Sequence, residues 1–133
     1  GGALGVAQFI WYQLLDNKRS VSLPDMQMGS FLGPAYEARE IKAFLESEGV
    51  SYLECQDDAE LADSVAGLLE AGNVIGWMQG RMEFGPRALG ARSILGDARS
   101  RDMQATINLK IKFRESFRPF APAVLEEHAN AYF

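Results

Sequence analysis

Residues 73–95 read NVIGWMQGRMEFGPRALGARSIL, and this stretch dominates the prediction of the fold. Asn73 to Gln79 is apolar enough for a buried strand, and a shorter strand is expected at Ser93 to Leu95. Between them, three glycines permit tight turns and a close approach of backbone to ligand: Gly80, Gly85 and Gly90. The stretch therefore predicts two strands joined by a glycine-rich loop that contains arginines.

Helix and strand patterns alternate along the rest of the chain. Apolar spacing predicts helices over residues 6–14, 36–48 and 58–71, the third capped by Asp57 or Asp58 and ended by Gly72. Further strands are expected at Val50–Cys55 and Phe120–Leu125. Ser100–Lys110 fits either type and is predicted as a helix, and residues 126–133 begin a helix or an extension. Alternating elements predict an α/β fold with a twisted open sheet, parallel or mixed, and flanking helices.

The chain divides by composition into three parts. Residues 1–19 end in a polar run, and residues 20–34 contain Pro24, Gly29, Gly33 and Pro34, which is typical of a linker. Residues 35–133 then form one domain. Because the first residue is a glycine in a Gly-Gly-Ala-Leu-Gly run, we expect the chain to be part of a longer protein.

Composition excludes several classes of protein. The chain has 133 residues, of which 47% are hydrophobic and 23% charged, as in ordinary globular domains. Its apolar runs are shorter than the roughly 18 residues that span a bilayer. A single cysteine, Cys55, and a single histidine, His128, can form neither a disulfide nor a zinc cluster. We therefore expect a cytoplasmic protein with no membrane segment and no metal site in this chain.

Charge is distributed unevenly. The net charge is −5, yet the segment from Arg81 to Arg118 contains nine basic and four acidic residues, a local charge of +5 that leaves −10 on the remainder. Nucleic-acid-binding domains are usually basic as a whole. An acidic chain with one arginine-rich segment is more typical of a site for a small anionic ligand.

The arginines can be interpreted in two ways. A guanidinium group stays charged and offers a planar fork of donors that matches phosphate or carboxylate, so convergent arginines beside glycine suit a phosphorylated ligand. Alternatively, the arginines are solvated or pair with nearby acids, for example Arg81 with Glu83 or Glu115. The residues by themselves leave both interpretations open.

Residues Gly80–Ile94 together with Lys112–Pro122 resemble the signature of the carbamoyltransferase family that includes NodU nodulation proteins and antibiotic carbamoyltransferases. The resemblance implies that the domain has a YrdC-like fold and follows a larger ASKHA-type, actin-like ATPase domain. Residues 1–19 would be the tail of that ATPase domain. Within them, Gly1, Gly2 and Gly5 resemble the end of its nucleotide-binding glycine motif.

The family resemblance also implies an activity. Carbamoyl phosphate and ATP would yield carbamoyl adenylate here, and the ATPase-like domain, which is expected to hold a metal, would pass the carbamoyl group to an acceptor hydroxyl. Arg87, Ser116 and Arg118 match the positions expected to contact the phosphate and carbamoyl groups. A second set of expected substrate ligands comprises Arg81, Arg92, Ser93, Lys112 and Arg114. The sequence shows no evident general base.

Two other functions compete with this one. Relatives with the YrdC fold are thought to grip RNA, although the net charge of −5 argues against RNA binding. The chain could also be a docking module that is inactive without its ATPase-like partner. Self-association is a further expectation, because residues 1–15 would expose Phe9, Ile10, Trp11 and Leu14 as an apolar patch.

Overall fold

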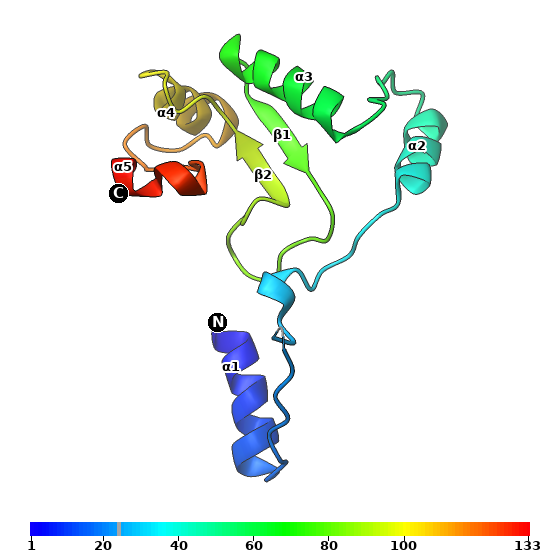
Figure 1. Ribbon diagram of the computed structural model, residues 1–133, viewed down its shortest axis with the longest axis vertical. Coiled ribbons are helices and arrows are strands. Elements are labelled where there is room, and N and C mark those ends of the chain that lie inside the picture. The colour runs from blue at the N-terminus through cyan, green and yellow to red at the C-terminus, as the bar shows by residue number, and fades with distance from the viewer. Residues whose placement is uncertain (24) are drawn as a thin grey trace. The chain divides into compact units, whose positions relative to one another are not determined.

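The computed structural model describes residues 1–23 and 25–133. Pro24, which belongs to the predicted linker, lies outside the described residues. Most of the regular structure is helical, and two strands pair in an antiparallel sheet (Figure 1). The chain forms two compact units, the first made of residues 1–52 and 77–93 and the second of residues 53–76 and 94–133. The division expected at residues 19 and 34 stays a prediction.

In the first unit, the chain begins with helix α1 (Gly2–Phe9), which continues as a π-helical turn at Ile10–Leu14. The helix stops where Asp16 adopts a positive φ of 51°. This confirms the helix predicted over residues 6–14. After a short 3-10 turn at Met28–Ser30, helix α2 (Ala38–Ser47) begins with the Glu40 carboxylate accepting the Glu37 backbone N–H at 2.7 Å.

The end of the predicted linker pairs with the chain at residues 82–84. The Gly33 N–H donates to the Met82 carbonyl at 2.8 Å, and the Met82 N–H donates to the Pro34 carbonyl at 2.9 Å. A Cβ on Gly33 would lie only 2.7 Å from the Met82 Cβ, so this close approach requires glycine. Residues 30–34 therefore lie directly against the glycine-rich loop.

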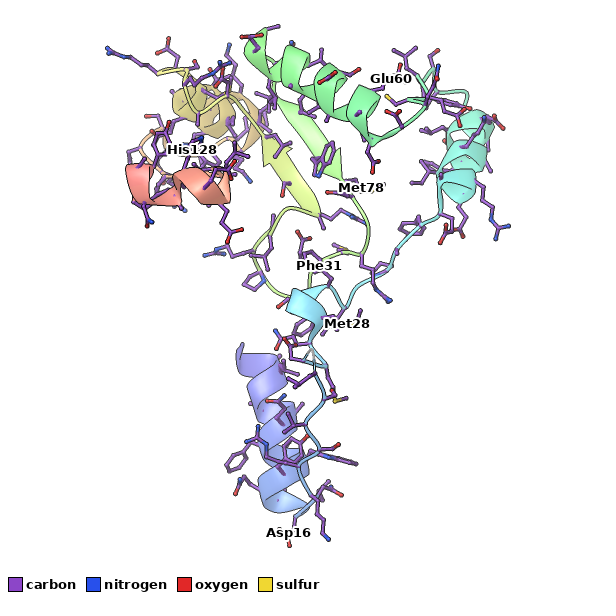
Figure 2. All side chains as sticks on the ribbon, viewed as in Figure 1. Asp16, Met28, Phe31, Glu60, Met78 and His128 are labelled. Carbon is purple, nitrogen blue, oxygen red and sulfur yellow. The ribbon has the colours of Figure 1, made fainter. Side chains whose placement is uncertain are left out.

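In the second unit, helix α3 (Asp58–Glu70) forms with the predicted cap. The Asp57 carboxylate accepts the Glu60 N–H at 2.9 Å, while the Glu60 side chain, labelled in Figure 2, accepts the Gln56 N–H at 2.6 Å. Gly72, at a φ of 84°, follows the last turn, as predicted.

The two strands are β1 (Ile75–Met78) and β2 (Arg92–Leu95), which run in opposite directions (Figure 1). Both lie where strands were predicted. The sheet is smaller than expected, however, because residues 50–55 and 120–125 form no strand. Val50 instead donates its N–H to the Leu45 carbonyl at the end of α2, and Pro122 has no N–H to give to a ladder. The prediction of a parallel or mixed sheet is wrong for the described residues.

The predicted helix at residues 100–110 is confirmed. It consists of α4 (Met103–Thr106) and a π-helical turn at Ile107–Ile111. The chain ends with a 3-10 turn at Glu126–His128 and the short helix α5 (Ala129–Tyr132). Within the described residues, no helix is long and apolar enough to cross a membrane.

The buried core is small. Among the described residues, Ala91 is the buried apolar residue of the first unit, and Met103 and Ile107 are those of the second. A Cβ on Gly96 would approach the Ile107 Cδ1 to 2.7 Å, so α4 and its π-helical turn pack tightly against the chain after β2. Two polar residues, Glu83 and Asn108, are as buried as this core. Glu83 lies within one arginine-bearing loop, and Asn108 donates hydrogen bonds to another.

Candidate functional site

Residues 79–92, which connect β1 to β2 and include the first residue of β2, are the first arginine loop. Its centre is the Glu83 side chain, which is 9% exposed. One carboxylate oxygen, Oε1, accepts the backbone N–H groups of Leu89 at 2.8 Å, Ala91 at 2.7 Å and Arg92 at 3.2 Å. The carboxylate thus closes the loop on itself.

These hydrogen bonds determine the charge of Glu83. They lower its pKa from the ordinary 4.5 to about 2, with the Leu89 N–H as the largest cause. Burial opposes this shift, while N–H groups of Glu83 itself, Ala91 and Arg92 add to it. Glu83 is therefore ionised at neutral pH and holds the loop, and it is not suited to donate a proton there.

Two arginines of the first arginine loop bind backbone carbonyls, Arg92 within the loop and Arg81 outside it. The Arg92 guanidinium donates from Nη1 to the carbonyls of Ala91 at 2.9 Å and Gln79 at 3.2 Å, and from Nη2 to the Gly80 carbonyl at 3.1 Å. Arg81 donates from Nε to the Gly33 carbonyl at 3.0 Å. Within the described residues, no ion pair joins Arg81 to Glu83. The structural Arg81–Glu83 pair that was the alternative to substrate binding is therefore not present there.

Arg87 is different from its neighbours. It is exposed, and with the residues that the structure describes its guanidinium makes one long hydrogen bond, 3.4 Å from Nη1 to the carbonyl of the adjacent Pro86. Gly85 and Gly90 on either side have φ values of 130° and 108°, which other residues rarely adopt. The tight loop therefore presents Arg87 with most of its donors available to an anion.

A hollow of about 330 Å³ lies beside the first arginine loop. It is lined by Phe31, Gln79, Gly80, Arg81, Leu89, Gly90 and Ala91, all within the first unit, and Phe31 is labelled in Figure 2. Because Arg81 uses Nε for the Gly33 carbonyl, its two terminal nitrogens are not engaged by that bond. The hollow offers donors and an aromatic ring in one place.

The second arginine loop, residues 112–122, belongs to the second unit and is held by side chains of the helical segment before it. Asn108 is fully buried and donates from Nδ2 to the carbonyls of Ser116 at 3.1 Å and Arg118 at 2.8 Å. Gln104 donates from Nε2 to the carbonyls of Phe117 at 3.2 Å and Arg118 at 3.1 Å. Three consecutive carbonyls are thereby bound by the helical segment.

The charged residues of the second arginine loop also differ in the partners that they bind. Arg114 donates from Nε to the Asn108 Oδ1 at 2.7 Å and lies 5.1 Å from the centre of the Phe120 ring. Arg118 is about half exposed and donates to the Glu115 carboxylate at 2.8 Å. That bond, after the backbone N–H of Glu115 itself, lowers the pKa of Glu115. Ser116 and Lys112 are exposed.

The structure thus groups the predicted site residues into two sets. The first unit contains Arg81, Arg87, Arg92 and the half-buried Ser93 of β2, and the second contains Lys112, Arg114, Ser116 and Arg118. Gly1, Gly2 and Gly5 lie at the start of α1, with open space where a Cβ would be. The roles predicted for these residues stay predictions.

Sequence reasoning missed the residues that hold the second arginine loop. Asn108 and Gln104 are one helical turn apart, so they lie on the same side of the helical segment. The sequence does contain a signal for them: Gln104 and Asn108 are four residues apart and each directly follows one of the buried residues Met103 and Ile107. For Glu83 the sequence indicates an ion pair with Arg81 or a weak substrate contact, whereas its partners in the structure are three backbone N–H groups.

Comparison with known proteins places this sequence in a family. The family model described as "Carbamoyltransferase C-terminus" matches residues 66–133. An uncharacterized protein of Synechocystis is 53% identical over 134 residues, and nodulation protein NolO of Bradyrhizobium diazoefficiens is 44% identical over 133 residues, both covering all of this chain. The 3'-hydroxymethylcephem-O-carbamoyltransferase of Streptomyces clavuligerus is 43% identical over 77 residues, or 58% of this chain.

These relatives are much longer than this chain. The matched region is 22% of the Synechocystis protein, 24% of NolO and 14% of the cephem carbamoyltransferase. The family match runs from within α3 to the last residue, so it includes both strands and both arginine loops. It confirms the resemblance drawn from Gly80–Ile94 and Lys112–Pro122, and the chain belongs to the carbamoyltransferase C-terminus family.

Proposed function

We propose that this chain is the part of an O-carbamoyltransferase that binds carbamoyl phosphate and ATP and forms carbamoyl adenylate. The observation that carries the proposal is the pair of arginine loops, each shaped by a buried polar side chain and each presenting cationic groups to solvent. Both loops lie in the region matched by the carbamoyltransferase C-terminus family. A chain of net charge −5 that concentrates its arginines on such loops is suited to a compact anion.

The proposed reaction has a simple atom balance. Water converts carbamoyl phosphate to carbamate and inorganic phosphate, and a carbamate oxygen then bonds to the α-phosphorus of ATP as pyrophosphate leaves. Negative charge is redistributed over phosphate oxygens in both steps. Fixed guanidinium groups stabilise that charge without having to reorganise, which is the main contribution of a protein to phosphoryl transfer.

The loops suggest distinct roles for the cations. Arg87 has the most donors available, so we assign it to phosphate binding. Ser116 and Lys112 are exposed on the second arginine loop and would contact the same class of ligand. Arg118 would exchange its Glu115 partner for substrate, whereas Arg92 and Arg114 already serve the loop backbone and the Asn108 side chain.

The rest of the proposal concerns the longer protein. We propose that an ASKHA-type ATPase domain transfers the carbamoyl group to the acceptor hydroxyl and holds any metal, and that Gly1, Gly2 and Gly5 belong to its nucleotide site. The YrdC-like fold also remains a proposal, supported by family membership and not by the small sheet. A crystal structure of the full-length protein with ATP would test both.

Substitution of the loop arginines tests the function directly. In the full-length protein, Arg87→Ala and Arg118→Ala should each lower kcat/KM for carbamoyl-phosphate-dependent pyrophosphate release on the order of 100-fold, because each removes a charge placed for the transition state. Arg101→Ala is the matched control. Arg101 lies in the same basic segment, is exposed, and its side chain makes no hydrogen bond or salt bridge with the described residues.

Other results would favour the competing functions. Unchanged activity in both loop variants would contradict the proposal. RNA binding that weakens steeply with added salt would support an RNA-binding module. Full activity that depends on the longer protein, with no carbamoyl phosphate bound by this chain, would support a docking module.

A further inference from the structure

The Asn108 side chain is completely buried and uses its hydrogen-bonding groups on one loop. Its two Nδ2 bonds go to the carbonyls of Ser116 and Arg118, and its Oδ1 accepts from the Arg114 Nε. An asparagine amide has two donor hydrogens, so both are accounted for by these carbonyls. No buried side-chain polar atom of the described residues lacks a partner, which indicates a fully satisfied network.

These bonds fix the direction of the peptide groups in the loop. The carbonyls of Ser116, Phe117 and Arg118 all accept from Asn108 or Gln104. The three residues themselves are exposed. Binding the carbonyls on the helical side therefore leaves the Ser116 hydroxyl and the Arg118 guanidinium on the solvent side.

Little else restrains this stretch. Phe117 is 77% exposed and contributes little packing. Within residues 1–23 and 25–133 the loop has no strand partner, and Pro119 lacks a backbone donor. The remaining bonds within residues 115–118 are local, from the Arg118 N–H to the Glu115 carbonyl at 3.3 Å and from the Arg118 Nε to the Glu115 carboxylate at 2.8 Å. The conformation of the loop consequently depends on the two amide side chains.

We propose that Asn108, assisted by Gln104, is the positioning residue that holds Ser116 and Arg118 in place for the phosphate of the substrate. This inference rests on the proposed function. A positioned loop binds an anion without first losing conformational freedom, so the effect should appear in affinity as well as in rate. Because the Asn108 side chain is fully buried, it acts through the loop and not by direct contact with the substrate.

Three isosteric variants of the full-length protein test the proposal. Asn108→Asp removes both donations to the loop while keeping an acceptor for Arg114. Gln104→Glu removes the neighbouring donations at an exposed position, so it remains informative if a buried carboxylate at position 108 prevents folding. Asn73→Asp is the control, because Asn73 makes the same type of bond in the same unit, from Nδ2 to the Leu68 carbonyl at 2.9 Å, away from the loop.

Two measurements are needed: calorimetric titration with inorganic phosphate, and hydrogen exchange of the amides in residues 112–118. We expect Asn108→Asp to weaken phosphate binding roughly tenfold and to speed exchange in the loop, Gln104→Glu to do both less strongly, and Asn73→Asp to do neither. Phosphate affinities within about twofold of the wild type in both loop variants would overturn the inference.

Equal weakening by Asn73→Asp would also overturn it, because the effect would then be one of general stability. Wild-type protein that binds neither phosphate nor carbamoyl phosphate would instead overturn the proposed function. In that case the hydrogen-exchange rates of residues 112–118, compared between the wild type and Asn108→Asp without ligand, would decide whether Asn108 holds the loop. The two failures are therefore distinguishable.

Discussion

Glu83 makes the shape of the first arginine loop depend on pH. Its pKa of about 2 in the folded chain lies below the ordinary 4.5, so the ionised carboxylate stabilises the fold above about pH 4.5. That stabilisation is lost as the pH falls from 4.5 towards 2, when the carboxylate becomes protonated. Acid in this range should therefore loosen the loop, whereas at neutral pH the loop should keep its shape.

Substitution of Glu83 isolates this effect. Glu83→Gln should lower stability at pH 7 and flatten the pH dependence of unfolding between about pH 4.5 and 2, because Gln has no charge to lose. Glu83→Ala should destabilise further, since three backbone N–H groups lose their acceptor. Urea unfolding at several pH values measures both.

Glu127→Gln, at an exposed carboxylate, is the control for the Glu83 variants. It should leave the pH profile as in the wild type. A Glu83→Gln profile that follows the wild type through this range would show that Glu83 does not set the acid sensitivity of the chain.

The arginines show how far residue types predict a site. The sequence identifies the two loops, because arginine beside glycine and proline is visible without a structure. It does not distinguish Arg87, which is open to solvent, from Arg92, which binds three carbonyls. That distinction depends on which backbone groups the folded loop brings within reach, and no spacing rule contains this information.

At the scale of elements, α3 offers a direct test of local stability. Asp57→Ala removes the acceptor for the Glu60 N–H and should lower the free energy of unfolding by about 1 kcal/mol. Asp57→Asn retains a capping oxygen and should stay within a few tenths of a kcal/mol of the wild type. Denaturant unfolding of both variants is the measurement. Equal losses in both would show that charge, and not capping, is the cause.

The elements also differ in how well the sequence predicts them. The helices and the strands β1 and β2 follow local patterns, such as the Asp57 cap and the apolar run before Gly80. The wrong strands, at residues 50–55 and 120–125, have suitable composition but no neighbouring strand to pair with. Pairing is a property of distant parts of the chain, which explains why local composition overestimated the sheet.

At the scale of the whole molecule, the main feature is the apolar surface of α1 and its π-helical turn. Phe9 is 65% exposed, Trp11 53% and Leu14 72%, which confirms the exposure predicted for these side chains. Exposed patches of this kind favour association. We therefore expect the isolated chain to form oligomers.

Two substitutions test this prediction. Phe9→Glu and Leu14→Glu should each shift the chain towards monomer in sedimentation velocity experiments, because each places a charge in the apolar patch. Gln13→Glu adds the same charge at a polar position of the same segment and should change little. A wild-type chain that remains monomeric over the whole concentration range would contradict the prediction.

The bonds by which Glu83 and Asn108 shape the two arginine loops join residues close together in the sequence. Glu83 reaches six to nine residues ahead, and Asn108 reaches eight to ten. Chain segments of about ten residues close within roughly 10–100 ns, much faster than whole domains fold. Both loops can therefore form early in folding, before distant parts of the chain meet. Because the bonds to Glu83 do not involve α1, they can persist when α1 melts, and we then expect the Ala91 amide, which donates to Glu83, still to exchange slowly.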